Sequence, residues 1–136
     1  MARTNVRVSA IILKDDKILL IHRKKNGEEY WVFPGGGVED TETPEQGIIR
    51  EVKEETGLDV LKCKLAFMAY NEASKTDQPF YICEVSDGIP EIIGEEKEKN
   101  SPENWYQLEW VKISNLNDIW LVPEKAKTEI IDRYLV

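Results

Sequence analysis

Three glutamates, Glu51, Glu54 and Glu55, are spaced i, i+3 and i+4 within one short segment. If this segment is a helix, which turns about 100° per residue, their carboxylates share one face. Neighbours of like charge repel each other there by roughly a few tenths of a kcal/mol per pair. An acidic helix face is often only a solvated surface, but this one follows a predicted glycine turn at Gly36, where backbone can approach a ligand closely. The pattern therefore indicates a bound cation.

The same segment carries the start and stop signals of a helix over residues 44–56. Thr43 is the expected N-cap, Pro44 takes the first helical position, and Gln46 completes a capping box with Thr43. Gly57 is expected just past the end, because glycine adopts a positive φ most easily. The buried side of this helix is predicted to consist of Ile48, Ile49 and Val52.

Apolar, β-branched and aromatic runs elsewhere predict a sheet, and the chain ends in a second amphipathic helix over residues 123–135. The acidic stretch 94–104 is predicted to be a loop. No repeat or linker divides the chain, so we expect one α+β domain over residues 1–136. Strands are expected at residues 6–13, 17–22, 30–33, 60–70, 79–85 and 105–113.

Composition is that of a folded globular domain, with 41% hydrophobic and 32% charged residues in a chain of 136. No apolar run is long enough to span a bilayer, and the first residues lack the apolar region of a signal peptide. These observations predict a cytoplasmic protein. In that compartment the two cysteines, Cys63 and Cys83, are expected to be buried and reduced, although a disulfide or metal role stays open.

The formal net charge of −8 is unevenly distributed along the chain. Residues 1–34 carry seven basic and four acidic side chains, a net +3, so residues 35–136 hold −11. Because Lys and Arg drive phosphate binding, an acidic protein is not expected to bind nucleic acid in general. Binding of phosphates would require a divalent metal together with the basic first third of the chain.

A stretch of the chain resembles the Nudix box, G-x5-E-x7-R-E-U-x-E-E-x-G-U, where U is a bulky aliphatic residue. All nine specified positions match, and such a fixed spacing is far more specific than a short glycine motif. A W-x-F-P-G-G entry before the box is consistent with the same family. The matching residues are Gly36, Glu42, Arg50, Glu51, Val52, Glu54, Glu55, Gly57 and Leu58.

The resemblance implies a Nudix α/β/α sandwich, a mixed sheet with the box helix on one face and the C-terminal helix on the other. It also implies hydrolysis of a pyrophosphate bond with Mg²⁺ or Mn²⁺, held by the box glutamates and the backbone carbonyl of Gly35. These oxygens are ligands that Mg²⁺ prefers. Arg50 is expected to orient Glu54, four residues later, through its bidentate guanidinium. Glu42, ahead of the helix, is expected to have a structural role.

The resemblance leaves the residues outside the box less defined. Family members often take a further ligand or general base from a later loop, for which Glu98 and Glu103 are favoured here over Glu95 and Glu96. Arg23, at a strand end, is predicted either to bind phosphate or to be a surface charge. His22 is expected to have a structural or surface role. The aromatic side chains of Trp31 and Phe33 should share a face, where they would either hold a nucleobase or pack in the core.

The resulting prediction is a metal-dependent pyrophosphohydrolase acting on a nucleoside diphosphate linked to another group. MutT-like nucleoside triphosphatases, including those for oxidised nucleotides, and ADP-ribose pyrophosphatases are the leading subclasses. The alternatives are a non-catalytic nucleotide sensor and an RNA 5′-end pyrophosphohydrolase, the latter disfavoured by the acidic balance. The partner is therefore a small nucleotide rather than a membrane or a nucleic acid, and the aromatic residues of the last third leave a homodimer open.

Overall fold

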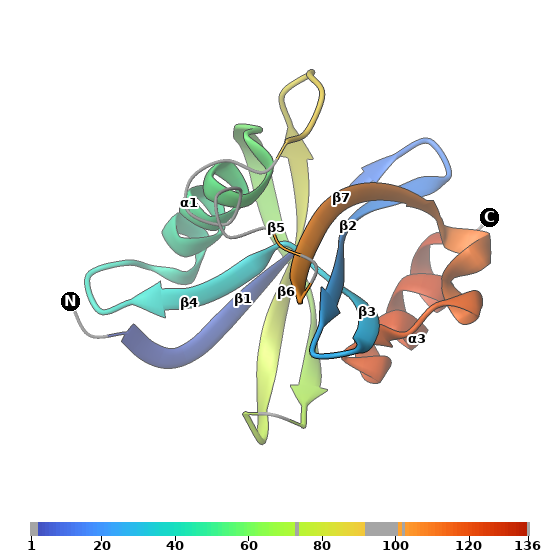
Figure 1. The fold of residues 1–136 in the computed structure, drawn as a ribbon. Helices are drawn as coiled ribbons and strands as arrows, with labels where there is room; N and C mark the ends of the chain where they lie inside the picture. Colours follow the sequence, from blue (N-terminus) through green and yellow to red (C-terminus); the bar gives the residue numbers. More distant parts are fainter. Residues whose placement is uncertain (1–2, 73, 92–100, 102, 136) are drawn as a thin grey trace.

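The structure is a computed structural model that describes residues 3–72, 74–91, 101 and 103–135. Among these described residues there are eight strands, two α-helices and one 3-10 helix, Ile113–Asp118 (Figure 1). In chain order the elements are β1 (Arg3–Lys14), β2 (Lys17–Lys25), β3 (Glu28–Val32), β4 (Gly35–Glu39), α1 (Pro44–Thr56), β5 (Val60–Asn71), β6 (Thr76–Val85), β7 (Asn104–Lys112), η1 (Ile113–Asp118), β8 (Leu121–Val122) and α3 (Glu124–Tyr134).

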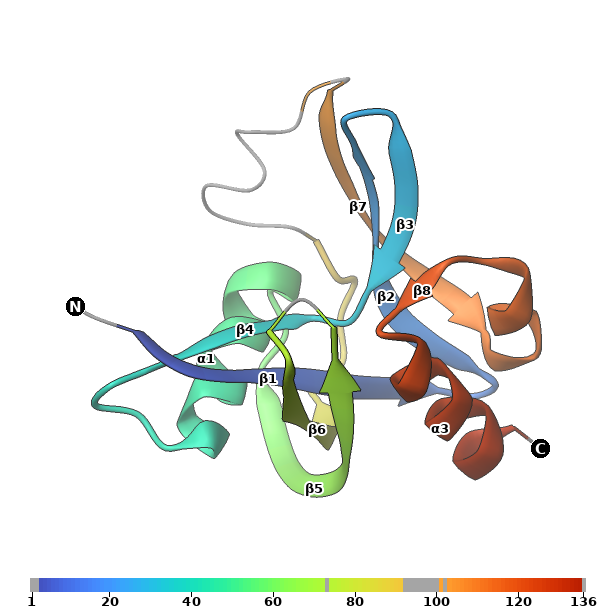
Figure 2. The ribbon, with the colours of Figure 1, turned by 90° about the horizontal axis from the view of Figure 1, so that it is seen from below.

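The strands form a mixed, strongly curved sheet in the order β5-β6-β1-β2-β3-β8, with β4 beside β1 and β7 beside β2. Strands β1 and β2 form a hairpin in which only Leu13 pairs with Ile18 and Lys14 with Lys17. Beyond these pairs β1 joins β4 and β6, whereas β2 joins β3 and β7. Figure 2 shows the two strands diverging from their common turn. This divergence leaves room for a pocket between them.

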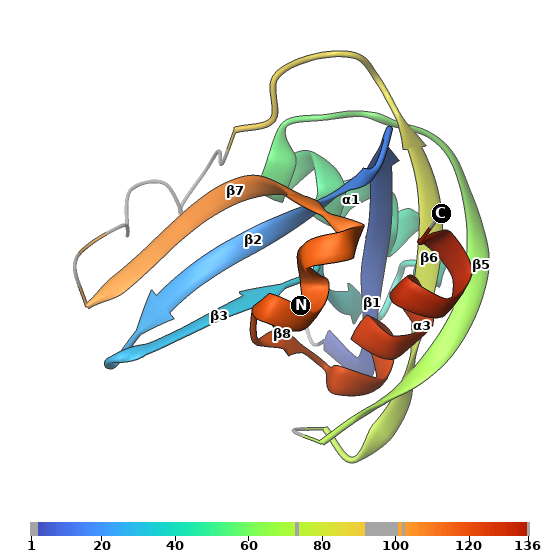
Figure 3. The ribbon, with the colours of Figure 1, turned by 90° about the vertical axis from the view of Figure 1, so that its right-hand side faces the viewer.

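Two hydrophobic cores lie on the two faces of the sheet, and alternate residues of β1 belong to each. Val8, Ala10 and Ile12 pack with α1, while Ile11 packs with α3. Helix α1 contributes Ile48 and Val52 to the first core, and α3 contributes Ala126 and Ile130 to the second. Figure 3 shows the two helices covering opposite sides of β1. The expected α/β/α sandwich is confirmed.

Helix α1 has the predicted bounds, Pro44–Thr56, because local chemistry determines both of its ends. The Thr43 side chain accepts from the backbone N–H of Gln46, and the Gln46 side chain accepts from that of Thr43. Gly57 closes the helix at φ 76°, in the left-handed region. The C-terminal helix is two residues shorter than predicted, since Pro123 and Leu135 are its caps.

The predicted glycine turn is wrong, because residues 35–37 belong to strand β4. They pair with residues 7–9 of β1 in antiparallel register. A Cβ atom on Gly35 would lie 2.0 Å from the carbonyl oxygen of Val8, so only glycine lets the two strands approach this closely. The glycines therefore serve close strand packing rather than chain reversal.

The remaining expectations concern short elements and the cysteines. Strand β8 and the 3-10 helix were not predicted from the sequence, and the strand expected at residues 105–113 ends one residue earlier, at Lys112. Cys63 and Cys83 are free thiols on facing positions of β5 and β6; Cys83 is buried, as predicted, whereas Cys63 is only half-buried because β5 lies at the edge of the sheet. Within the described ranges, no helix is both long and apolar enough to cross a membrane.

Candidate active site

Arg50 connects several residues of the Nudix box through hydrogen bonds. Its guanidinium donates to both carboxylate oxygens of Glu42, at 2.7 and 2.9 Å, and to Glu51 at 2.9 Å. It also donates to the carbonyl oxygen of Gly37 at 3.0 Å and, more weakly, to Glu54 at 3.4 Å. The sequence pointed to Glu54 as the partner of Arg50, whereas the closest contacts are those with Glu42 and Glu51. Arg50 thus joins α1 to the loop before it and to β4.

Glu42 lies on the loop between β4 and α1, where its side chain is 14% exposed. Besides the two contacts from Arg50, it accepts a hydrogen bond from the backbone N–H of Glu39 at 2.9 Å. Hydrogen bonding to Glu42 is also the main reason that the pKa of Arg50 is raised above its ordinary value. These contacts support the structural role expected for Glu42, because they connect the loop to the helix.

Glu51 and Glu55 lie directly against the glycine strand. Glu51 is only 5% exposed, and a Cβ atom on Gly36 would lie 2.6 Å from its carboxyl carbon. One carboxylate oxygen of Glu55 accepts a hydrogen bond from the backbone N–H of Gly35 at 3.1 Å. Two box carboxylates therefore contact the two glycines that precede the helix, and a larger residue at Gly36 would displace one of them.

The donor set at this junction fits a hard divalent cation, because it consists of carboxylate oxygens beside a glycine backbone. In the described part of the chain, no three His, Cys, Asp or Glu side chains are already gathered into a metal cluster. The contacts explain this, since Arg50 reaches Glu51 and Glu54, and Glu55 bonds to backbone. A cation would compete with these donors for the same oxygens.

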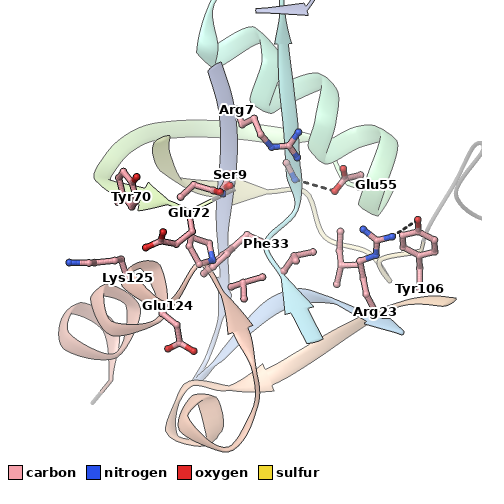
Figure 4. Close-up of a pocket in the computed structure, with 16 residues that line it drawn as sticks. Arg7, Ser9, Arg23, Phe33, Glu55, Tyr70, Glu72, Tyr106, Glu124 and Lys125 are labelled. Atoms are coloured by element: carbon pink, nitrogen blue, oxygen red, sulfur yellow. Dashed lines mark hydrogen bonds between the residues drawn. The ribbon is translucent and has the colours of Figure 1, made fainter. Parts of the chain in front are cut away.

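A pocket of about 650 Å³ lies beside this junction (Figure 4). Gly35 and Glu55 belong to its wall, so the pocket reaches the edge of the box. Strands β1 and β2 contribute from either side, as expected from their divergence, and the first residues of α3 contribute at one end. Its floor is apolar and includes Ile21, Val32, Phe33, Val122 and Pro123. The arrangement joins an acidic site to a cavity large enough for a nucleotide-sized ligand.

Arg23 lines this pocket and is held in place by β7. Its guanidinium donates to the hydroxyl of Tyr106 at 2.6 Å and to the side chain of Asn104 at 3.3 Å, and lies 4.2 Å from the Tyr106 ring centroid. The Nε atom of Arg23 is buried and has no hydrogen-bond partner among the described residues. A buried donor of this kind is costly unless an acceptor reaches it. The geometry suits an anionic ligand at Arg23.

The two aromatic candidates both pack with the core beneath α3, but only one reaches the pocket. Phe33 is 6% exposed, lines the cavity and meets Phe80 edge-on at 5.0 Å. Trp31 is not among the lining residues and stacks on His22 at a centroid distance of 4.0 Å. His22 is in turn held between two carboxylates, Glu29 at 2.6 Å and Glu109 at 2.8 Å.

Of the later-loop candidates, only Glu103 belongs to the described residues, and it lies apart from this assembly. Glu98, like Glu95 and Glu96, falls outside the described residues. Glu103 is exposed just before β7, and its carbonyl oxygen accepts from the backbone N–H of Asn26 in the β2–β3 turn at 3.2 Å. It does not line the pocket.

Sequence reasoning missed several polar residues in the pocket wall, among them Arg7 on β1, Glu72 after β5, Tyr106 on β7, and Glu124 and Lys125 at the start of α3. The period of two along β1 was a usable signal, because it places Arg7 on the same face as Ser9. Tyr106 and the start of α3 join the pocket through tertiary contacts that no local pattern reveals.

The chain matches the NUDIX domain over residues 3–129. It is 36% identical over 121 residues to an ADP-ribose pyrophosphatase of Methanocaldococcus jannaschii, a match that covers 88% of this chain and 69% of that protein. The chain therefore belongs to the Nudix family, and the prediction of a pyrophosphohydrolase acting on phosphoric anhydrides is confirmed.

Two further similarities show how varied its relatives are. An 8-oxo-dGTP diphosphatase of Proteus vulgaris is 38% identical over 65 residues, which cover 46% of this chain and 58% of that protein. A solved MutT structure, from work on Aliivibrio salmonicida and Vibrio cholerae, aligns with a TM-score of 0.74 at 24% identity, covering 95% of this chain and 98% of the other. The structural match concerns the fold alone.

Proposed function

We propose that this protein hydrolyses a pyrophosphate bond in a nucleoside diphosphate linked to another group, in a reaction that depends on Mg²⁺ or Mn²⁺. The observation that carries the proposal is the convergence of the box carboxylates on β4 at the edge of the pocket. Glu51, Glu54, Glu55 and the backbone carbonyl of Gly35 would hold the metal. A divalent ion supplies charge neutralisation of the diphosphate and activates water for attack on phosphorus.

The residues of the chain have separate tasks in this reaction. Glu51, buried and held by Arg50, keeps one carboxylate fixed against β4. Glu55 is the box glutamate that lines the pocket, so it is the group best placed to accept a proton from the attacking water. Arg23 donates to the phosphate oxygens that carry charge as the bond breaks.

Two substrate classes are supported by relatives named for them. One is a nucleoside diphosphate sugar such as ADP-ribose, and the other is a nucleoside triphosphate, oxidised or not. A volume of about 650 Å³ with an apolar floor suits a nucleoside in either case. A relative named RNA pyrophosphohydrolase covers only 36% of this chain, and the net charge of −8 opposes binding of an RNA backbone.

The first test is turnover of a nucleotide panel with Mg²⁺, covering dNTPs, 8-oxo-dGTP, ADP-ribose, dinucleotides and 5′-triphosphate RNA. Wild-type protein should release phosphate or pyrophosphate products from at least one of the small nucleotides, and a chelator should abolish this release. Glu54→Gln should lower the rate by at least about 10²-fold, as expected when a metal ligand or base is removed. Glu129→Gln is the matched control, because Glu129 pairs with Arg133 on α3, outside the box.

The outcomes separate the proposals. Tight binding of one nucleotide without turnover would favour a sensor, and cleavage of RNA alone would favour the RNA 5′-end activity. Wild-type activity in Glu54→Gln would show that the metal site lies elsewhere.

A further inference from the structure

Arg7 is a charged residue on a face of β1 that otherwise leads into the core. Arg7, Ser9 and Ile11 are alternate residues of this strand and share one face. Ser9 lines the pocket, and Ile11 is fully buried beneath α3. Strand β1 lies inside the sheet, between β6, β4 and β2, so Arg7 does not protect an open edge. Its position at the pocket wall therefore needs another explanation.

The backbone of Arg7 is fixed relative to the box. Its N–H donates to the side-chain oxygen of Gln78 at 2.7 Å, and Gln78 is only 4% exposed. On the other side Arg7 pairs with Gly37 of β4, two residues beyond the glycine that contacts Glu55. The Cα atom of Arg7 is thus held by buried contacts on both flanks.

The side chain of Arg7, in contrast, makes no hydrogen bond or ion pair with any other described residue. It is exposed, whereas Arg50 is bound to several acceptors and Arg23 to the side chains of Asn104 and Tyr106. A guanidinium presents five donors in a planar fork that matches phosphate oxygens. Arg7 therefore brings this donor set to the pocket with its position fixed and its head group available.

Charge is distributed unequally along the pocket. Figure 4 shows Arg7 and Arg23 on the side of the cavity where Glu55 lies, and Glu72 and Glu124 toward α3. The first end carries two guanidiniums and one carboxylate, whereas the second carries two carboxylates and the ammonium of Lys125, so the balance of charge attracts phosphate to the first end. The polar groups near α3 suit a ligand portion that donates hydrogen bonds, such as a base or a ribose.

We propose that Arg7 is a second phosphate-binding arginine at the same end of the pocket as Arg23, so that the diphosphate contacts guanidiniums from both β1 and β2. This inference rests on the proposed function, since it assigns a further specificity-determining residue to the same site. It also sets an orientation, with the phosphates at Glu55 and the nucleoside directed toward α3.

The test compares Arg7→Gln with Arg133→Gln, which removes the same charge from α3 at a position that does not line the pocket and pairs with Glu129. For whichever nucleotide the enzyme cleaves, Arg7→Gln should lower kcat/KM by about tenfold or more, as expected for the loss of a charge-assisted hydrogen bond. Arg7→Lys should recover only part of this, because an ammonium keeps the charge and loses the fork. Arg133→Gln should resemble wild type.

Binding supplies a second measurement that does not depend on turnover. Calorimetry with α,β-methylene-ADP in the presence of a chelator should show a dissociation constant about tenfold higher for Arg7→Gln than for wild type. The salt dependence of binding should also become shallower. Equal affinity in Arg7→Gln and wild type, while Arg23→Gln binds more weakly, would overturn the proposal. Absence of turnover in wild type with a loss of binding in Arg7→Gln would instead reject the hydrolase function and keep Arg7 as a phosphate contact.

Discussion

Replacing Arg50 by methionine removes the guanidinium that binds several residues of the box and keeps a side chain of similar length. The change deletes contacts to Glu42, Glu51, Glu54 and the carbonyl oxygen of Gly37. The Glu42 and Glu51 side chains are 14% and 6% exposed, so their carboxylates would remain largely desolvated beside each other without a cation. We expect the metal-free protein to lose stability rather than to reorganise freely.

The magnitude follows from burial. Removing one partner of a buried ion pair costs about 3–5 kcal/mol, whereas an exposed pair contributes about 0–1 kcal/mol. The contact with Glu54, whose side chain is 56% exposed, belongs to the second class, and those with Glu42 and Glu51 approach the first. Arg50 itself is 22% exposed, which moderates the effect. A decrease of about 3 kcal/mol in the free energy of unfolding is therefore expected for Arg50→Met.

Urea unfolding in a chelator measures this decrease directly, with Arg133→Met as the control. Arg133 is exposed and makes a 2.7 Å pair with Glu129 on α3, so its replacement should cost much less than that of Arg50. Excess Mg²⁺ should restore part of the loss in Arg50→Met, because a cation that binds only the folded state stabilises it. Equal stability of Arg50→Met and wild type without metal would refute the reasoning, since the acidic cluster would then need no internal cation.

Two other perturbations test the packing around the box. Gly36→Ala should reduce activity in the nucleotide assay at least about tenfold, since its Cβ would lie 2.6 Å from the Glu51 carboxylate. Circular dichroism should show that the fold is retained, and unchanged activity would contradict the contact. Burial raises the pKa of the Cys83 thiol to about 12, so above pH 9 the unfolded thiol ionises first and stability falls by up to about 1.4 kcal/mol per pH unit. Cys83→Ala should lose this part of the alkaline slope in urea unfolding, and identical slopes would contradict the burial argument.

The bounds of α1 could be predicted from the sequence because neighbouring residues determine where the helix begins and ends. Thr43 and Gln46 exchange hydrogen bonds across one turn, and Gly57 supplies the positive φ, so the helix bounds follow from neighbouring residues. The spacing of the box glutamates on one face follows from the same helix.

The parts that could not be predicted depend on strand neighbours distant in the chain. Gly35 lies in a strand because Val8 lies against it, and nothing near Gly35 in the sequence indicates this contact. The main partner of Arg50 is Glu42, eight residues earlier, which the loop brings back toward the helix. Tyr106 reaches Arg23 across the β2–β7 pairing.

The two cores that share β1 have an evolutionary consequence. The chemistry of the box is supported by one core, which includes Ile48 and Val52 of α1, while the other core supports α3 and the pocket floor around Phe33. Mutations that reshape the second core can alter which ligand fits without disturbing the carboxylates. Such a division allows substrate preference to diverge while bond cleavage is conserved, and relatives of this chain are indeed named for ADP-ribose and for 8-oxo-dGTP.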